Sequence, residues 1–216
     1  MEHSVIDSTN TQRWYRVGLI AGRSYCVITV PTGDGFNDTV TDVYSDAVGT
    51  VLVSNNDDNF NEPISGRHSR NCFIYSAANT SEARLKVTLF SPGDTLIRFK
   101  MVDTALNGPW FFVESATSYN AFIEIGNTTN TAVSVTVTIR NPAGATIGTP
   151  QTVAIAGYGN TALNVVSSFG TTVANGSGSV QVAHNGAPGA IVANVTTLSA
   201  MTGLSFDAPL TRRQNW

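Results

Sequence analysis

Charged residues are scarce in this chain of 216 residues, where they make up 12 % of the total, with 12 Lys and Arg against 15 Asp and Glu. This is about half the share of an average soluble domain. The net charge of −3 leaves no basic stripe that would displace counterions from phosphates, which argues against a nucleic-acid partner. The composition also argues against disorder, because the chain is not strongly charged and 42 % of its residues are hydrophobic.

Long apolar runs are missing as well. No stretch approaches the ~20 apolar residues that cross a bilayer, so we expect no transmembrane segment. Residues 1–10 are polar and contain no basic region followed by an apolar run, so we do not expect them to form a secretory signal. Either a signal has been removed or the protein is cytoplasmic. The low charge, the abundance of Thr, Asn and Gly, and two cysteines in predicted strands nevertheless favour an extracellular, cell-surface location.

Residues that carry catalysis or bind transition metals are few. The histidines are His3, His68 and His184, and although Ser65 and Ser69 flank His68, the sequence has no Gly-x-Ser-x-Gly elbow. Two cysteines 46 positions apart with dispersed histidines lack the ligand spacing of a zinc site. We therefore expect a protein that is not an enzyme.

The chain is instead rich in Thr, Val, Ala, Asn, Ser and Gly, the residues of short strands joined by tight turns. Alternation and β-branched runs between turn signals predict strands at residues 14–20, 24–30, 39–44, 50–54, 72–76, 84–90, 95–102, 110–114, 121–125, 132–140, 152–156, 161–166, 178–184 and 190–198. This pattern predicts an all-β protein, because no long segment shows a convincing helical period.

Four turns are marked by their residues. Residues 46–49 predict a hairpin between strands 39–44 and 50–54, and residues 91–94 predict one between 84–90 and 95–102. Strong turns are also predicted at 141–144 and at His184-Asn185-Gly186, where Asn-Gly is the pair favoured in two-residue hairpins.

Acidic residues divide the chain into two parts. Thirteen of the 15 lie before Ser115, and only Glu124 and Asp207 follow it. Strands recur in both parts at the spacing of a sandwich. We expect two β-sandwich domains in tandem, residues 1–114 and 115–216, joined with little linker.

An ordered series of short motifs runs through residues 10–90: Trp14-Tyr15-Arg16-Val17, Leu19-Ile20-Ala21-Gly22-Arg23-Ser24-Tyr25, Phe36-Asn37-Asp38-Thr39, Asp42-Val43-Tyr44, Gly49-Thr50-Val51-Leu52, Ser54-Asn55-Asn56-Asp57-Asp58 and Cys72-Phe73-Ile74-Tyr75. In this order they resemble the bacterial pre-peptidase C-terminal domain, a small secreted, jelly-roll-like β-sandwich. One departure is that the usual closing Gly-x-Tyr-Tyr element reads Glu82-Ala83-Arg84-Leu85.

The second half has an aromatic strand at 119–125, then Asn127, a β-branched strand, and the turn Asn141-Pro142-Ala143-Gly144. This pattern is similar to the immunoglobulin-like repeats of bacterial surface proteins.

The resemblance of the first half implies a non-catalytic appendage of a secreted enzyme or surface protein, and some relatives bind calcium or extended polymers. The positions that match the acidic turns of the family are Asp38, Asp57 and Asp58. Calcium prefers several oxygen ligands of this kind, so we expect a calcium site there as the one candidate cofactor. The alternative is that these residues only form Asx-turns.

Cys26 and Cys72 lie in strands assigned to the same sandwich. An even cysteine count in an extracellular protein favours a disulfide between them. The alternative is two buried free thiols, since a cysteine is small and apolar enough for a core.

Aromatic residues suggest contact surfaces. Trp14 alternates with apolar neighbours, which predicts a core position. Trp110 and Phe111 lie at the expected domain junction, and the C-terminal tail adds Arg212, Arg213 and Trp216. Trp and Arg are enriched at interface hot spots, so we expect these five residues at interfaces.

The leading functional expectation is a non-catalytic extracellular structural protein, a subunit of a bacterial surface filament, pilus-like fibre or layer, whose partners are copies of itself or another surface subunit. The alternative is a calcium-assisted binding module of a secreted protein that targets a polymer or a partner enzyme.

Overall fold

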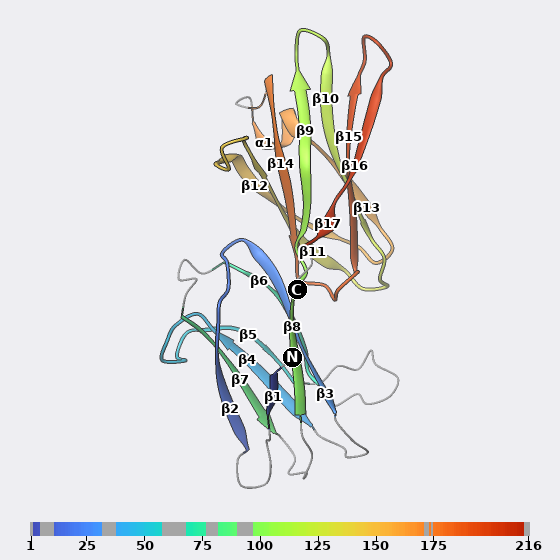
Figure 1. Ribbon diagram of the computed structural model, residues 1–216. Coiled ribbons are helices and arrows are strands. Elements are labelled where there is room, and N and C mark those ends of the chain that lie inside the picture. Colours follow the sequence, from blue (N-terminus) through green and yellow to red (C-terminus); the bar gives the residue numbers. More distant parts are fainter. Residues whose placement is uncertain are drawn as a thin grey trace. The chain divides into compact units, whose positions relative to one another are not determined.

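The chain folds into two compact units, Met1–Asp103 and Thr104–Trp216. This computed structural model describes residues 2–4, 11–31, 38–57, 68–76, 82–89, 97–170, 173 and 175–213. Almost all regular structure is antiparallel β, which confirms the predicted all-β class (Figure 1). The boundary precedes the one expected after Glu114, because β9 (Leu106–Glu114) pairs along its length with β14 (Asn175–His184) of the second unit.

Two four-stranded sheets form the first unit. One has the order β1 (Glu2–Ser4), β8 (Ile97–Asp103), β3 (Arg23–Pro31) and β6 (Arg70–Tyr75). The other has the order β2 (Gln12–Val17), β7 (Ala83–Leu89), β4 (Thr39–Tyr44) and β5 (Leu52–Asn56). Strict alternation along β7 buries every second residue, as expected of a strand with one face on a core.

The core of the first unit has an apolar part and a polar part. Its apolar part comprises Leu19, Tyr25, Val27, Val43, Phe73, Tyr75, Ala83, Leu85, Val87, Leu89 and Phe99. In the polar part, Thr29 and Thr39 share a hydrogen bond of 2.7 Å. Ser69 bonds to Thr41, and Asn71 donates to the carbonyl of Thr41 at 3.1 Å. These groups satisfy one another, which removes the cost of burying them.

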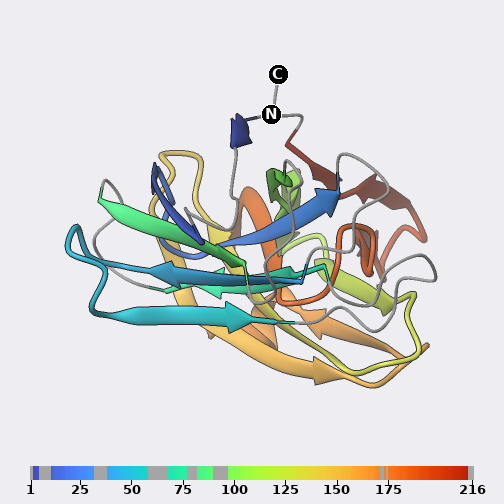
Figure 2. The same cartoon turned by 90° about the horizontal axis from the view of Figure 1, so that it is seen from below.

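The predicted hairpin around residues 46–49 is confirmed, since β4 and β5 pair antiparallel and lie next to each other in Figure 2. Asp46 closes the turn, because its carboxylate accepts hydrogen bonds from the backbone N–H groups of Thr50 and Val51. These bonds, above all that from Val51, favour the charged form and lower the pKa of Asp46 to about 2.

Trp14 is not in the core, contrary to the expectation, because 44 % of its surface is exposed on the edge strand β2. Its ring contacts Tyr44 at 5.3 Å between centroids and lies under the ammonium of Lys86 at 5.7 Å. A Cβ on Gly49 would come within 2.6 Å of this ring, and the φ of Gly49 is +78°. Alternation therefore predicted the strand but not which of its faces is covered.

A nine-stranded sheet makes up the second unit. Its path is β12 (Thr146–Ile155), β11 (Val133–Arg140), β14, β9, β10 (Tyr119–Asn127), β15 (Ile191–Ser199) and β16 (Ser205–Pro209), while β13 (Asn160–Asn164) pairs with β10 and β17 (Thr211–Arg212) with β9. β9 and β10 pair through Glu114 and Tyr119. Both halves of this sheet contribute to one apolar core, which contains Phe111, Val113, Ala121, Ile123, Ile125, Val135, Val137, Ile139, Val180, Val182 and Val195.

A strand predicted at 161–166 is replaced after β13 by the short helix α1 (Val165–Phe169). The side chain of Asn164 accepts hydrogen bonds from the backbone N–H groups of Val166 and Ser167, which caps the first turn. Val165 and Phe169 lie four positions apart and both are buried, so the helix packs one face on the core.

The other predicted turns give mixed results. Residues 141–144 join β11 and β12 as a hairpin, as expected. The hairpin predicted between strands 84–90 and 95–102 does not form, because β7 and β8 belong to different sheets; residues 91–94 themselves lie outside the described residues. The chain bends at Asn185 and Gly186, as the predicted turn requires, but it makes no hairpin there, since β14 pairs with β9 and β11, whereas β15 pairs with β10 and β16.

Cys26 and Cys72 form a disulfide, as predicted. They stand directly opposite each other on the neighbouring strands β3 and β6, with their Cα atoms 4.1 Å apart.

Candidate binding site

Strand β9 contributes two exposed residues to the candidate site, because its pairing with β14 is irregular. Gly178 of β14 faces Phe111, whereas Val180 faces Gly108, so Pro109 and Trp110 together stand opposite one residue. A β-bulge of this kind turns side chains away from the regular alternation. Pro109 and Trp110 are both exposed as a result.

Gly178 allows β11 and β14 to approach closely beside this bulge. A Cβ at Gly178 would lie 1.9 Å from the carbonyl oxygen of Arg140 and 2.8 Å from the ring of Phe111. Any larger residue would push the two strands apart, so this glycine is a requirement of the local structure.

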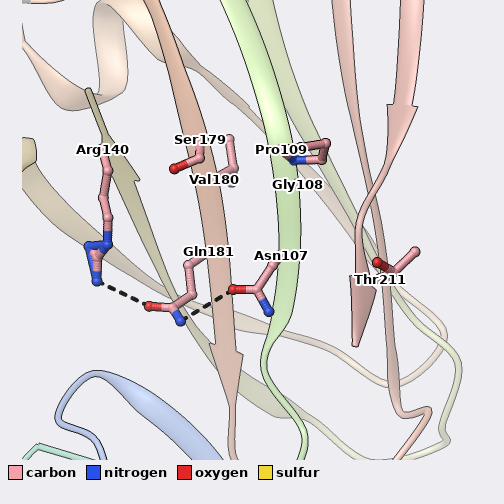
Figure 3. Close-up of a pocket in the computed structure, with 8 residues that line it drawn as sticks. All are labelled: Asn107, Gly108, Pro109, Arg140, Ser179, Val180, Gln181 and Thr211. Carbon is pink, nitrogen blue, oxygen red and sulfur yellow. Dashed lines mark hydrogen bonds between the residues drawn. The ribbon is translucent and has the colours of Figure 1, made fainter. Parts of the chain in front are cut away.

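Three polar side chains form a row across β11, β14 and β9 (Figure 3). Arg140 donates to Gln181 at 3.3 Å, and Gln181 donates to Asn107 at 3.4 Å. The row lines a hollow of about 380 Å³, which is completed by Gly108, Pro109, Ser179, Val180 and Thr211. A second hollow of about 250 Å³ adjoins it, since both are lined by Pro109 and Ser179, and it extends to Trp110, Asn141 and Pro142.

Aromatic side chains gather around Trp110. Its ring stacks on Phe112 at 6.0 Å with planes 4° apart, and it meets the edge of Phe206 at 6.4 Å. Tyr119 completes the group through Phe112 and Phe206. Trp110 is 41 % and Phe206 49 % exposed. We call these four residues, Trp110, Phe112, Tyr119 and Phe206, the aromatic cluster.

The charge around the row is positive. The ion pairs among the described residues are Arg16–Glu82, Arg23–Asp103 and Lys86–Asp42, all in the first unit. In the described part of the second unit, Arg140 therefore has no carboxylate partner within 4.0 Å. Its other hydrogen bond goes to the hydroxyl of Thr146 at 3.4 Å, close to the upper limit for such a bond.

The expected interface residues lie in different environments. Trp110 belongs to the aromatic cluster, and Arg212 and Arg213 are exposed at the end of β17. The prediction that Phe111 lies at an interface is wrong, because its side chain is fully buried in the core of the second unit and offers no surface to a partner. Trp216 lies outside the described residues.

The expected calcium ligands are only partly described. Asp38 directly precedes β4 and Asp57 directly follows β5, and since Thr41 pairs with Asn56, both acids lie at the same end of this hairpin. Asp58 is outside the described residues. Within the described ranges, no group of three or more His, Cys, Asp or Glu side chains converges.

His68 is buried, with 6 % of its surface exposed, and no described residue bonds to its Nδ1. Burial lowers its pKa, while the nearby carboxylate of Asp38 acts in the opposite direction. The hydroxyl of Ser69 bonds instead to Thr41 and to the carbonyl of Asn56 at 2.9 Å. Ser69 is thus engaged in the polar part of the core.

Asn127 begins an Asn-x-Thr glycosylation sequon with Thr128 and Thr129, but its side chain has a structural role. Asn127 is 4 % exposed, and its amide donates to the carbonyls of Thr131, Ile155 and Ala156. Its amide oxygen accepts from the backbone and hydroxyl of Thr129. This side chain joins the loop after β10 to the end of β12 and is not accessible for glycosylation.

Sequence reasoning did not single out Asn107, Gln181 or Phe206. One signal was present, since a proline inside a strand, as in Gly108-Pro109-Trp110, marks a bulge or an edge. The row itself is formed by residues up to 74 positions apart, which no local pattern brings together.

Comparison with known proteins does not assign the chain to a family: no protein-family model matches the sequence, and no curated protein is significantly similar to it. The structure thus defines an all-β protein of two sandwich units with one disulfide. Its described residues include no helix of the length and hydrophobicity needed to cross a membrane.

Proposed function

We propose that the protein is a non-catalytic subunit of an extracellular assembly, a filament, pilus-like fibre or layer at a bacterial surface. The observation that carries this proposal is the aromatic cluster of the second unit, whose members Trp110 and Phe206 are about half exposed. Exposed aromatic groups of this size mark contact surfaces, because they gain the most free energy when a partner covers them. The partner proposed is a further copy of this chain or another surface subunit.

The surroundings of the cluster support association. Only Glu114, Glu124 and Asp207 supply negative charge in the described second unit, and each has a hydroxyl or amide partner within the unit. The second unit has few charged residues on its surface and strand edges. Charged side chains on edge strands oppose pairing with another chain, so their scarcity favours association. The disulfide supports a non-reducing, extracellular location. The sequence resemblances to pre-peptidase C-terminal and immunoglobulin-like domains agree with such a role.

The test is the particle size of the purified protein by light scattering and electron microscopy over a wide range of concentration. We expect oligomers or fibres from the native chain, and monomers from the double variant Trp110→Ser, Phe206→Ser. The matched control is Tyr158→Ser, which removes an aromatic side chain that is 74 % exposed elsewhere in the same unit. Circular dichroism verifies that all variants are folded.

A native chain that stays a compact monomer at high concentration, alone or with a co-expressed surface subunit, would overturn the assembly proposal. Equal assembly of the double variant and the native chain would overturn the role of the aromatic cluster.

A second candidate function is a calcium-assisted binding module. It is favoured by the placement of Asp38 and Asp57 at one end of the β4–β5 hairpin, where Asp58 follows in sequence. Calcium in the millimolar range should raise the melting temperature of the native chain, and a chelator should reverse this. The double variant Asp57→Asn, Asp58→Asn should lose the response, while Asp207→Asn in the second unit should keep it. An unchanged melting temperature in the native chain would leave these residues as turn formers.

A further inference from the structure

The larger hollow has the dimensions and the lining of a ligand site. Its volume of about 380 Å³ falls in the range of small-molecule sites. Its wall is a row of amide and guanidinium groups, Asn107, Gln181 and Arg140, with hydroxyls of Ser179 and Thr211 beside them. The amides and hydroxyls both donate and accept hydrogen bonds, and the guanidinium donates, as the hydroxyls of a sugar require.

The hydrogen bonds that join the three side chains of the row are long and therefore weak. Arg140 to Gln181 measures 3.3 Å, Gln181 to Asn107 3.4 Å, and Asn107 to the carbonyl of Ala105 3.2 Å. Bonds of 3.3–3.4 Å lie beyond the usual range of N–H···O bonds, so little is lost when a ligand oxygen replaces one of them. The backbone positions of the three residues are fixed by strand pairing, which reduces the cost of ordering the site on binding.

Arg140 gives the larger hollow its positive charge. Its guanidinium is half-buried and faces no carboxylate of the described second unit within 4.0 Å. A carboxylate fits two parallel N–H groups of a guanidinium, and such pairs are stronger than neutral hydrogen bonds. A single arginine with no basic neighbours in the hollow does not suit a polyphosphate backbone, which needs several cations.

Trp110 gives the adjoining hollow an aromatic wall, and Pro109 and Ser179 line both hollows. A partly exposed indole offers a flat apolar surface beside polar donors. A sugar ring has apolar C–H groups on its face and hydroxyls at its rim, so it complements both walls at once.

We propose that the groove formed by the two hollows binds an acidic saccharide, with a uronic-acid carboxylate on Arg140 and an adjacent sugar ring against Trp110. The proposal goes beyond assembly and is tested apart from it at Arg140. Arg140, Gln181 and Asn107 lie outside the aromatic cluster, whereas Trp110 belongs to both surfaces.

Titration calorimetry of the full chain against short oligouronates tests the proposal, with oligomers of galacturonate, glucuronate and mannuronate as probes. The methyl esters of the same oligomers are the neutral comparison. We expect at least one oligouronate to bind and its ester to bind at least about tenfold more weakly, since a charged hydrogen-bonded pair contributes that much or more.

The variant Arg140→Gln should lose binding by about tenfold or more, whereas Arg213→Gln should bind within about twofold of the native chain. Both variants remove one positive charge from the same unit, so the pair separates a local contact from general electrostatics. Melting temperatures verify that both are folded. Trp110→Ala should weaken binding of oligomers more than binding of a single uronate.

The proposal is overturned if no oligouronate binds, if the esters bind as tightly as the acids, or if both arginine variants bind alike. It also fails if a short oligoglutamate binds as tightly as the oligouronates, because the site would then recognise carboxylates without the sugar. Loss of binding in Arg140→Gln with unchanged particle size would separate this site from the assembly surface.

Discussion

His184 shows at the scale of one residue what this core does to a titratable group. Its side chain is 1 % exposed at the end of β14. Burial lowers its pKa to about 4, Arg212 acts in the same direction, and hydrogen bonding to the backbone of Thr104 and Gly186 opposes the change. The imidazole is therefore neutral in the folded chain at pH values where it is charged in the unfolded chain.

This difference makes the second unit sensitive to acid. A histidine in the unfolded chain has a pKa of about 6.5, so between this value and about 4 the unfolded state binds more protons than the folded state. The contribution of His184 to the free energy of unfolding is complete above pH 6.5 and is lost as the pH falls. We expect a loss of about 3 kcal/mol between pH 7 and pH 4.

Urea unfolding of the native chain and of His184→Gln at pH 7, 5 and 4 measures this effect. The variant should lose about 3 kcal/mol less than the native chain over this range. His68→Gln is the companion variant, because the pKa of His68 is also lowered by burial, with Asp38 opposing. Identical pH profiles for the native chain and His184→Gln would contradict the assignment.

At the scale of elements, the disulfide joins two neighbouring strands of one sheet. Cys26 of β3 pairs in register with Cys72 of β6, and the chain between them includes β4 and β5 of the opposite sheet. The bond therefore fixes the two ends of a segment that crosses from one sheet to the other and returns. In the chain-entropy picture a loop of this length stabilises the folded state by about 4 kcal/mol.

The double variant Cys26→Ala, Cys72→Ala should lower the free energy of unfolding of the first unit by about 4 kcal/mol, as measured in urea. Reduction of the native chain with dithiothreitol should have a similar effect. Thiol titration of the unreduced, denatured chain provides the direct control. Two titratable thiols per chain would show that the bond does not form.

On the scale of the whole molecule, the two units differ in the chemistry of their interiors and surfaces. The first has a core that is partly a network of hydroxyl and amide groups, and it contains the three ion pairs of the described residues. The second has a larger apolar core and few charges. In the described residues of the second unit, the aromatic cluster is partly exposed and Arg140 pairs with no carboxylate. The first feature supports the assembly proposal and the second supports the saccharide proposal.

Much of the architecture was predictable from local sequence. Alternation and turn residues predicted most of the strands, the β4–β5 and β11–β12 hairpins, and the all-β class, because the pleat and the turn are decided by a few neighbouring residues. Short elements were missed where local signals compete. Val165 and Val166 favour a strand, yet the side chain of Asn164 caps a helix there.

Tertiary structure alone decided which strands share a sheet and which faces are covered. Residues 91–94 look like a hairpin turn, but β7 and β8 pair with distant strands. Trp14 alternates like a core residue, but its side chain is 44 % exposed on an edge strand. Asn107, Arg140 and Gln181 form one row only because strand register joins positions far apart in sequence. Local preferences act over a few residues, whereas pairing and burial depend on the whole chain, so the sequence by itself determined the strands and the class, and the folded structure determined the site.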